Sequence, residues 1–260
     1  MQDVIKTEIH RPEKIVWEFP HVSFGESWEE QIPSDSTRKL IEKIDFFLRK
    51  AQITYEWRDL TDELFQSWFL YYKQNMRTLS HDIIATPDWY HVRAKKLEGA
   101  YILTCKDLHG IVVGSCIVIK RNGQWTECFK ANDRIDLGGT GNLALGTLID
   151  LMYLKYAFDH NAQKVTSGRS RNAFGFYNTL GYLTFKLKLG YVPVLPYDTK
   201  WLMDFPKKNT ETTAWFACDA CESHQEKQFF LLVYPNEFAL ENEARIYLSR
   251  LGILMQSFQD

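Results

Sequence analysis

The sequence predicts an α+β fold, in which a central mixed, mostly antiparallel and twisted sheet is flanked by helices. Three strand-like segments follow one another closely within Ala100–Lys130, and such strands pair as antiparallel neighbours. Helical periodicity then alternates with single strands within Leu145–Leu195, as is typical of helices that cover a sheet. We expect an N-terminal extension over residues 1–52, packed on a main domain over residues 53–260 that ends in a hairpin and a helix.

Length and composition indicate an ordinary globular protein. The 260 residues are enough to bury a large core, with 45% hydrophobic and 25% charged residues. The formal net charge of −2 provides no overall positive field, so we expect no nucleic-acid partner. The segment Met1–His10 lacks the apolar run of a signal peptide, and no stretch approaches the length of a membrane span. The expected location is therefore cytoplasmic.

The N-terminal part contains prolines and then a helical pattern. Residues 1–33 contain Pro12, Pro20 and Pro33 and are predicted to be irregular, lying across the main domain. Ser34 and Ser36 offer N-cap oxygens. The residues that follow predict one amphipathic helix ending near Lys50. Its apolar positions recur at helical spacing and are Leu40, Ile41, Ile44, Phe47 and Leu48.

The next segments predict one strand and two helices. Ile53–Trp57 is expected to be a strand. A helix then begins near Asp62, where acidic side chains suit the positive end of the helix dipole. A second helix is predicted from Thr86 to Leu97, with a proline in its first turn.

A meander of three strands is predicted next. Its first two strands are Ala100–Cys105 and Ile111–Lys120, with a bulge expected at Gly114. Asn122-Gly123 then predicts a type I′ hairpin turn, because this pair supplies the positive φ angles that the turn needs. The third strand is Trp125–Lys130.

The remaining elements alternate in type. A helix is expected from Leu145 to about His160, and another from Phe174 to about Leu189, where Gly190 stops it. The other predicted elements are strands at Lys164–Ser167 and Tyr191–Leu195, a pair of strands at Thr212–Cys218 and Gln228–Val233, and a C-terminal helix from Leu240 to Leu251.

Five cysteines are an odd number, and we expect reduced thiols. Cys218, Cys221 and His224 lie close together in sequence, but a structural zinc site requires four ligands. We therefore expect no metal and interpret this segment as a hairpin turn.

A glycine-bearing segment precedes the helix that begins near Leu145. A helix N-terminus presents N–H groups and partial positive charge, and small residues there let a pyrophosphate approach the backbone. A plain loop is the alternative at this point, because glycine before a helix is common. The candidate residues are Gly141, Asn142, Leu143, Ala144, Leu145, Gly146 and Thr147.

With the downstream spacing included, the chain resembles the GNAT superfamily of N-acyltransferases. The family's loop has Gln or Arg, two residues, Gly, one residue, and then Gly or Ala. We align Gly141, Ala144 and Gly146 with its three marked positions; a second register over Asp136–Gly141 lengthens the helix and puts Asp at the first position. The resemblance implies that this segment binds the pyrophosphate of acyl-CoA. The missing Gln or Arg departs from the pattern and puts ordinary tight binding of CoA in doubt.

Further motifs resemble the Fem-like branch of these acetyltransferase-like proteins. They are Lys164–Ser170, the pair Phe185-Lys186, and Gly190–Pro193. That branch commonly lacks the glycine-rich loop, which would account for its degenerate form in this sequence. The resemblance covers about residues 55 to 200. The family's later helix often carries Asn, a Tyr and a Gly-aromatic pair, which Asn172, Tyr177, Gly181 and Tyr182 match.

The resemblance implies roles for residues near the donor. The Tyr177 hydroxyl would lie near the thioester sulfur and protonate the leaving thiolate; a packed aromatic is the alternative. Asn172 belongs to the same motif, and Arg169 and Arg171 lie where phosphate or pantetheine would run. For both arginines the alternative is a surface turn.

Acyl transfer to an amine also requires a base and a stabilised oxyanion. Glu127 lies on the strand before the loop and is the candidate base, with an outward-facing strand carboxylate as the alternative. The sequence contains no Gly-x-Ser-x-Gly elbow for a serine nucleophile, so direct transfer without a covalent intermediate is predicted.

Three functions follow from these residues and the resemblance. The first is a transferase that carries out N-acylation of a small-molecule, amino-acid or peptide amine from acyl-CoA or the phosphopantetheine of an acyl carrier protein. The 15% aromatic content favours a medium or long acyl chain. The second is a Fem-like aminoacyl transferase that uses charged tRNA. The third is a non-catalytic binding module on this fold.

Overall fold

The computed structural model divides into two compact units, each described here by itself. The first unit comprises residues 1–18, 32–34 and 169–260, and the second comprises residues 19–31 and 35–168. Both units are discontinuous in sequence, and the expected extension over residues 1–52 contributes to each of them. The structure describes residues 9–22, 26–79, 82–138, 143–174, 178–196, 198–202, 213–219, 229–234 and 241–257.

The larger sheet is mixed and mostly antiparallel, as predicted. Its hydrogen-bonded order is β3-β4-β5-β6-β7-β2-β8, and β7 runs parallel to β6. The Asn122-Gly123 turn has φ angles of 50° and 73°, which confirms the predicted hairpin. The strands are β2 (Lys14–Phe19), β3 (Thr54–Asp59), β4 (Gly99–Lys106), β5 (Val112–Arg121), β6 (Gln124–Asn132), β7 (Lys164–Arg171) and β8 (Val192–Val194).

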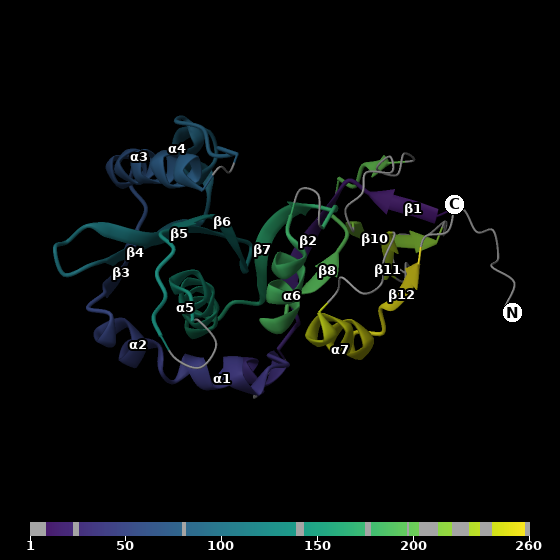
Figure 1. Cartoon of the computed structure of the whole chain (residues 1–260). Coiled ribbons are helices and arrows are strands. Elements are labelled where there is room, and N and C mark those ends of the chain that lie inside the picture. Colours follow the sequence, from purple (N-terminus) through teal and green to yellow (C-terminus); the bar gives the residue numbers. More distant parts are fainter. Residues whose placement is uncertain are drawn as a thin grey trace, which may run out of the picture. The chain divides into compact units, whose positions relative to one another are not determined.

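In the second unit, helices cover both faces of β3–β6. Figure 1 shows α3 and α4 on one face and α5 on the other, with α1 and α2 on the α5 side. These helices are α1 (Asp35–Ile41), α2 (Ile44–Lys50), α3 (Asp62–Thr78), α4 (Trp89–Val92) and α5 (Leu145–Asp159), with short 3-10 helices η1 (Trp28–Gln31) and η2 (Ala94–Lys96).

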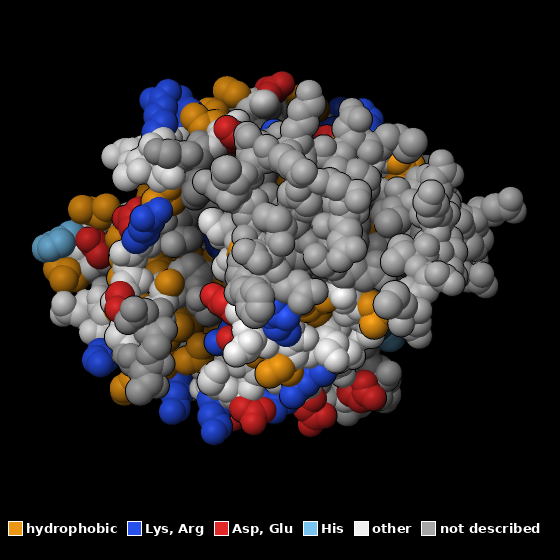
Figure 2. All heavy atoms as spheres, turned by 45° about the vertical axis from the view of Figure 1, so that its right-hand side comes forward, with side chains coloured by type: hydrophobic (Ala, Val, Ile, Leu, Met, Phe, Trp, Pro, Cys, Tyr) orange, Lys and Arg blue, Asp and Glu red, His pale blue; other side chains and the backbone are white. Residues whose placement is uncertain are grey.

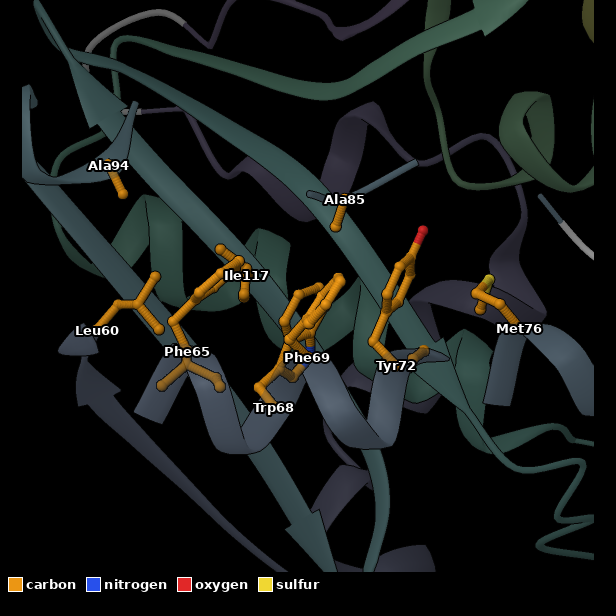
Figure 3. Close-up of a cluster of buried hydrophobic side chains, with 11 residues drawn as sticks. Leu60, Phe65, Trp68, Phe69, Tyr72, Met76, Ala85, Ala94 and Ile117 are labelled. Carbon is orange, nitrogen blue, oxygen red and sulfur yellow. The ribbon is translucent and has the colours of Figure 1, made fainter. Parts of the chain in front are cut away.

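An aromatic cluster fills the space between α3 and the sheet (Figure 3). Residues three and four apart on α3 point to the same side, so its buried aromatics form one stripe. The Trp68 ring lies 4.8 Å from that of Tyr72 and 5.6 Å from that of Phe129 on β6. Thr61 caps the helix by accepting a hydrogen bond from the Leu64 N–H at 3.2 Å, so α3 begins where the sequence predicts.

The predicted single helix before Lys50 is wrong, because the structure has two helices separated at Glu42-Lys43. Lys43 has φ −109° and ψ 7°, outside the helical range. The break redirects the chain, so that α1 packs against α5 while Ile44 and Leu48 of α2 are buried. One straight helix has a single apolar stripe and cannot make both contacts.

In the first unit, the described part of the proline-containing N-terminal segment forms strands rather than irregular structure. The burial of β2 alternates, with the Ile15 and Trp17 side chains fully buried. The Trp17 indole N–H donates to the Ser170 hydroxyl of β7 at 3.0 Å, and β2 pairs antiparallel with β8. Prolines are tolerated here because they lie at strand ends.

The second sheet contains the predicted C-terminal hairpin, β10–β11, and is followed by the predicted helix α7. Strand β1 inserts beside β10, with His10 opposite Cys218. The order is β12-β11-β10-β1-β9, and the elements are β1 (Ile9–Pro12), β9 (Trp201–Leu202), β10 (Thr213–Asp219), β11 (Phe229–Tyr234), α7 (Asn242–Arg250) and β12 (Leu254–Ser257). Cys221 and His224 lie outside the described residues.

Helix α6 (Leu180–Lys188) begins later than the predicted Phe174. The Thr179 hydroxyl accepts a hydrogen bond from the Tyr182 N–H at 3.1 Å and so fixes the start of the helix. Tyr177 lies outside the described residues.

Two properties of the described residues concern membranes and surface charge. Among them, no helix has both the length and the apolar character needed to cross a bilayer. On the face that Figure 2 shows, basic and acidic side chains of the described part are interspersed rather than gathered by sign.

Candidate active site

The candidate site of the second unit lies where β6 and β7 part. Their parallel pairing covers three residue pairs, of which the last is Thr126 with Thr166. The hydroxyls of these two threonines lie 2.9 Å apart. Beyond them no described residue of β6 pairs with β7, although β6 continues to Asn132 in its pairing with β5. Parting strands expose backbone edges with which an extended ligand can pair.

A β-bulge lies next to this divergence. Ile117 of β5 is opposite Phe129 and Val118 is opposite Glu127, so Cys128 is the extra residue of β6. Side chains along a strand alternate between the two faces of the sheet. One extra residue therefore turns every following side chain of that strand to the opposite face. Phe129 therefore joins the aromatic cluster under α3, and Lys130 reaches α5 on the other face.

Glu127 is buried at the point of divergence, with 6% of its surface exposed. The structure thus excludes an outward-facing strand carboxylate. The Ser167 hydroxyl of β7 donates a hydrogen bond to Glu127 Oε2 at 2.7 Å. This bond spans the gap between the strands immediately after their last backbone pair.

Gly168 lets β7 pass close to Glu127. Its φ is +64°, and a Cβ added there would lie 3.1 Å from the carbonyl oxygen of Glu127. Glycine adopts this left-handed conformation without the steric cost that a Cβ brings. The glycine therefore sets the geometry of the divergence.

Gly168→Ala should lower the free energy of unfolding by about 1–2 kcal/mol, because alanine in the left-handed region is strained. Gly181→Ala on α6 is the matched control, since Gly181 has no positive φ and a Cβ added there would lie 3.8 Å from the Thr179 hydroxyl oxygen. Urea unfolding of both variants measures the difference. Equal stability of the two would contradict the assigned role of Gly168.

Two groups near Glu127, the Tyr153 hydroxyl and the Cys116 thiol, are buried and neutral. The Tyr153 hydroxyl of α5 donates to the Thr166 carbonyl at 2.9 Å. Burial raises the pKa of Tyr153 well above its usual value, and the Glu127 carboxylate raises it further. Burial likewise raises the pKa of the Cys116 thiol, with Glu127 and Asp150 adding to the effect. Neither group provides a counter-charge for Glu127 at neutral pH.

A buried ion pair lies beside the start of α5. Lys130 donates to Asp150 Oδ2, and Asp150 is fully buried. The Lys130 ammonium also lies 3.5 Å from the Gly146 carbonyl. The sequence-based reasoning missed Ser167, Lys130 and Asp150, although a single acid inside the apolar pattern of Leu145–Tyr156 was an available signal.

The segment before α5 folds back on itself. The Leu145 N–H donates to the Ile135 carbonyl at 3.0 Å, and the Leu137 N–H donates to the Leu143 carbonyl at 2.8 Å. Ala144, the residue before α5, forms an isolated antiparallel β-bridge with Asp136. The Thr147 N–H donates to the Ala144 carbonyl at 3.0 Å. At least two amides of the predicted phosphate segment are therefore bonded within the chain.

Gly146 leaves space for the Asn132 side chain of β6. A Cβ added there would lie 2.9 Å from Asn132 Oδ1, so the glycine allows β6 to approach α5 closely. Gly141 and Asn142 lie outside the described residues, and their predicted role stays a prediction.

Comparison with known proteins establishes the fold. FemX superposes with a TM-score of 0.50 at 10% sequence identity, over 70% of this chain and 60% of that one. The chain has a GNAT-like fold. L-PGS from Bacillus licheniformis matches with a TM-score of 0.48 at 11% identity, over 74% of this chain and 60% of that one. A tandem GNAT protein from the clavulanic acid biosynthesis pathway matches at 0.39 and 16% identity, over 71% and 52%.

The chain spans 60% of the length of FemX and of L-PGS. No family model and no curated protein matches the sequence. The predicted resemblance is thus confirmed at the level of the GNAT-like fold.

The remaining predicted site residues belong to the first unit. Arg169 pairs with Asp198 at 2.6 Å, and Arg171 is exposed. Asn172 is buried, and its side-chain amide bonds to the Pro12 and Phe216 carbonyls and accepts from the Phe216 N–H. Asn172 thereby joins the strands of its own unit. The donor-binding roles predicted for these three residues stay predictions.

Proposed function

We propose that the chain is an N-acyltransferase that moves an acyl group from a thioester donor to an amine by direct attack. The donor is acyl-CoA or the phosphopantetheine of an acyl carrier protein, and the acceptor is a small-molecule, amino-acid or peptide amine. The observation that carries the proposal is the buried carboxylate of Glu127 at the parting of β6 and β7. The GNAT-like fold supports it.

The proposed reaction assigns a task to each group. The amine nitrogen bonds to the thioester carbon and its proton passes to Glu127, directly or through water. Backbone N–H groups of β6 near the bulge would stabilise the tetrahedral oxyanion. The carbon–sulfur bond then breaks, and Tyr177 gives the leaving thiolate its proton; solvent water then takes the proton from Glu127 and returns one to the Tyr177 phenolate. Ser167 positions Glu127 and does not react.

Donor binding is tested first by thermal unfolding with CoA, acetyl-CoA and a series of longer acyl-CoAs. A ligand bound to the native state stabilises it by about 2.7 kcal/mol at a concentration 100 times its Kd. A rise in Tm that grows with chain length is expected. Acyl transfer is then followed by the release of free thiol with a panel of amines.

A second candidate uses charged tRNA as the donor, as the Fem-like resemblance implies. The bonded amides of Leu145 and Thr147 favour it, because they leave less of the segment free to hold a pyrophosphate. Stabilisation by aminoacyl-tRNA, with no response to any thioester, would select this donor. No response to either donor would point to the non-catalytic binding module.

Tyr177→Phe should lower turnover more than it lowers donor affinity, because only the departure of the thiolate uses the hydroxyl. Steady-state kinetics give turnover, and thermal shift with the donor gives binding. Equal loss of both, or no loss, would exclude the proton-donating role.

A further inference from the structure

A pocket of the second unit lies on the α5 side of the edge strand β3. It has a volume of about 160 Å³ and is formed by the α1–α2 junction, β3 and α5. The chain breaks between α1 and α2, as it would not in a single helix. The C-terminal end of α1 and the N-terminal end of α2 therefore lie at the wall of the pocket. Its lining residues are Ile41, Glu42, Ile44, Asp45, Tyr55, Trp57, Met152, Lys155, Tyr156 and Asp159.

Stacked aromatic rings form one wall of this pocket. The rings of Trp57 and Tyr156 lie 4.0 Å apart with 10° between their planes. Tyr156 also contacts His160 at 4.1 Å and Trp125 at 5.7 Å, which restrains its ring. A restrained stack presents electron-rich ring surface at little cost in conformational entropy.

Acidic side chains form another part of the lining. The pocket has three carboxylates, from Glu42, Asp45 and Asp159, and one ammonium, from Lys155, which gives a formal charge of −2. Lys155 lies 2.8 Å from Asp159. Among the described residues, no basic side chain forms an ion pair with Glu42 or Asp45.

Asp45 faces the aromatic wall. Its Oδ1 accepts a hydrogen bond from the Tyr55 hydroxyl at 3.2 Å. Burial and then the Asp45 carboxylate raise the pKa of Tyr55, so its proton stays in this bond at neutral pH. Ile44 and Met152 are buried and provide apolar surface.

The acidic, aromatic and apolar lining of this pocket favours one class of ligand, an organic cation. Carboxylates repel anions, and the described residues contain no group of three metal-ligating side chains. Aromatic faces and carboxylates both attract an organic cation, and apolar surface suits its carbon stem. A second pocket, which Glu56 helps to line, differs because its Glu56 is already paired with Arg58 and Lys106.

We propose that the pocket formed by the α1–α2 junction, β3 and α5 binds an alkylammonium ion. The ion is either a free amine or the lysine side chain of a peptide. The ammonium lies between Asp45, Glu42 and the ring faces, and its stem lies against Met152. This inference concerns a different site from the proposed transfer centre and holds whether or not the chain transfers acyl groups.

Isothermal titration calorimetry of the full chain tests the proposal. The probes are n-butylammonium, neutral 1-butanol, and a short peptide with either one lysine or one acetyl-lysine. Saturable binding of butylammonium, with no binding of 1-butanol, is expected, and it should weaken with added salt. Binding of the lysine peptide, and not of its acetylated form, identifies a side chain as the source; binding of butylammonium alone identifies a free amine.

Variants separate this pocket from nonspecific binding. Glu42→Gln with Asp45→Asn, and separately Trp57→Leu, should each weaken butylammonium binding by about five- to tenfold. Glu63→Gln, an exposed acid on α3, is the matched control and should leave binding unchanged. Because Glu42 and Asp45 are exposed, their variants should keep the fold. Absence of saturable binding, equal binding of 1-butanol, or unchanged affinity in these variants would overturn the proposal.

Discussion

Glu127→Gln is expected to lower kcat of the proposed acyl transfer by about 10²–10⁴, the usual contribution of a positioned base. Glutamine has almost the same shape and keeps an oxygen that can accept the Ser167 hydrogen bond. The change therefore removes proton acceptance and largely preserves the packing. Steady-state kinetics measure kcat, and thermal shift with the donor verifies that the donor still binds.

Two companion variants distinguish a base from a structural carboxylate. Glu56→Gln, on the edge strand of the same sheet, should leave kcat unchanged because Glu56 faces a separate pocket. Ser167→Ala should lower kcat less than Glu127→Gln and should shift its pH profile, since it removes a bond to the carboxylate. A Glu127→Gln enzyme with normal kcat would exclude Glu127 as the base.

Lys130→Met should lower the free energy of unfolding by about 3–5 kcal/mol. The change removes the Lys130 ammonium from the fully buried Asp150 carboxylate, and loss of the opposite charge beside a buried ion is strongly destabilising. Adding Asp150→Leu should recover most of this loss, because it also removes the buried carboxylate. Urea unfolding of the two single variants and the double variant gives the coupling energy.

An exposed pair provides the comparison. Lys155 and Asp159 are spaced i,i+4 on the same helix and are each about half exposed. Lys155→Met should therefore change the free energy of unfolding by only about 0.3–0.5 kcal/mol. A similar effect of Lys130→Met would mean that water reaches the Asp150 carboxylate.

Local patterns in the sequence were sufficient for most elements of the second unit. Strand-like apolar runs between turns predicted β4 to β6, and helical spacing predicted α3 and α5, because those patterns record which side chains face the core. The turn at Asn122-Gly123 was predictable because its positive φ angles need those residue types.

Contacts distant in sequence were not predictable in this way. Nothing near Ile15 or Trp17 indicates that β2 pairs with β8, since pairing partners leave no local signature. The bulge at Cys128 was also missed, and with it the exchange of faces that brings Lys130 to Asp150. Glu127 was predicted as a candidate base, but its burial depends on β7 and α5, which only the folded chain brings together.

Strands β1 and β2 pair with strands that the ribosome synthesises much later. A ribosome makes β1 and β2 long before β7, which neighbours β2, and before β8, β9 and β10, which emerge only after residues 192–219 have been added. At about 5–20 residues per second, the two strands wait of the order of ten seconds or more with unpaired backbone edges. A chain truncated before β8 would thus leave β1 without its partners β9 and β10, while β2 would keep its neighbour β7.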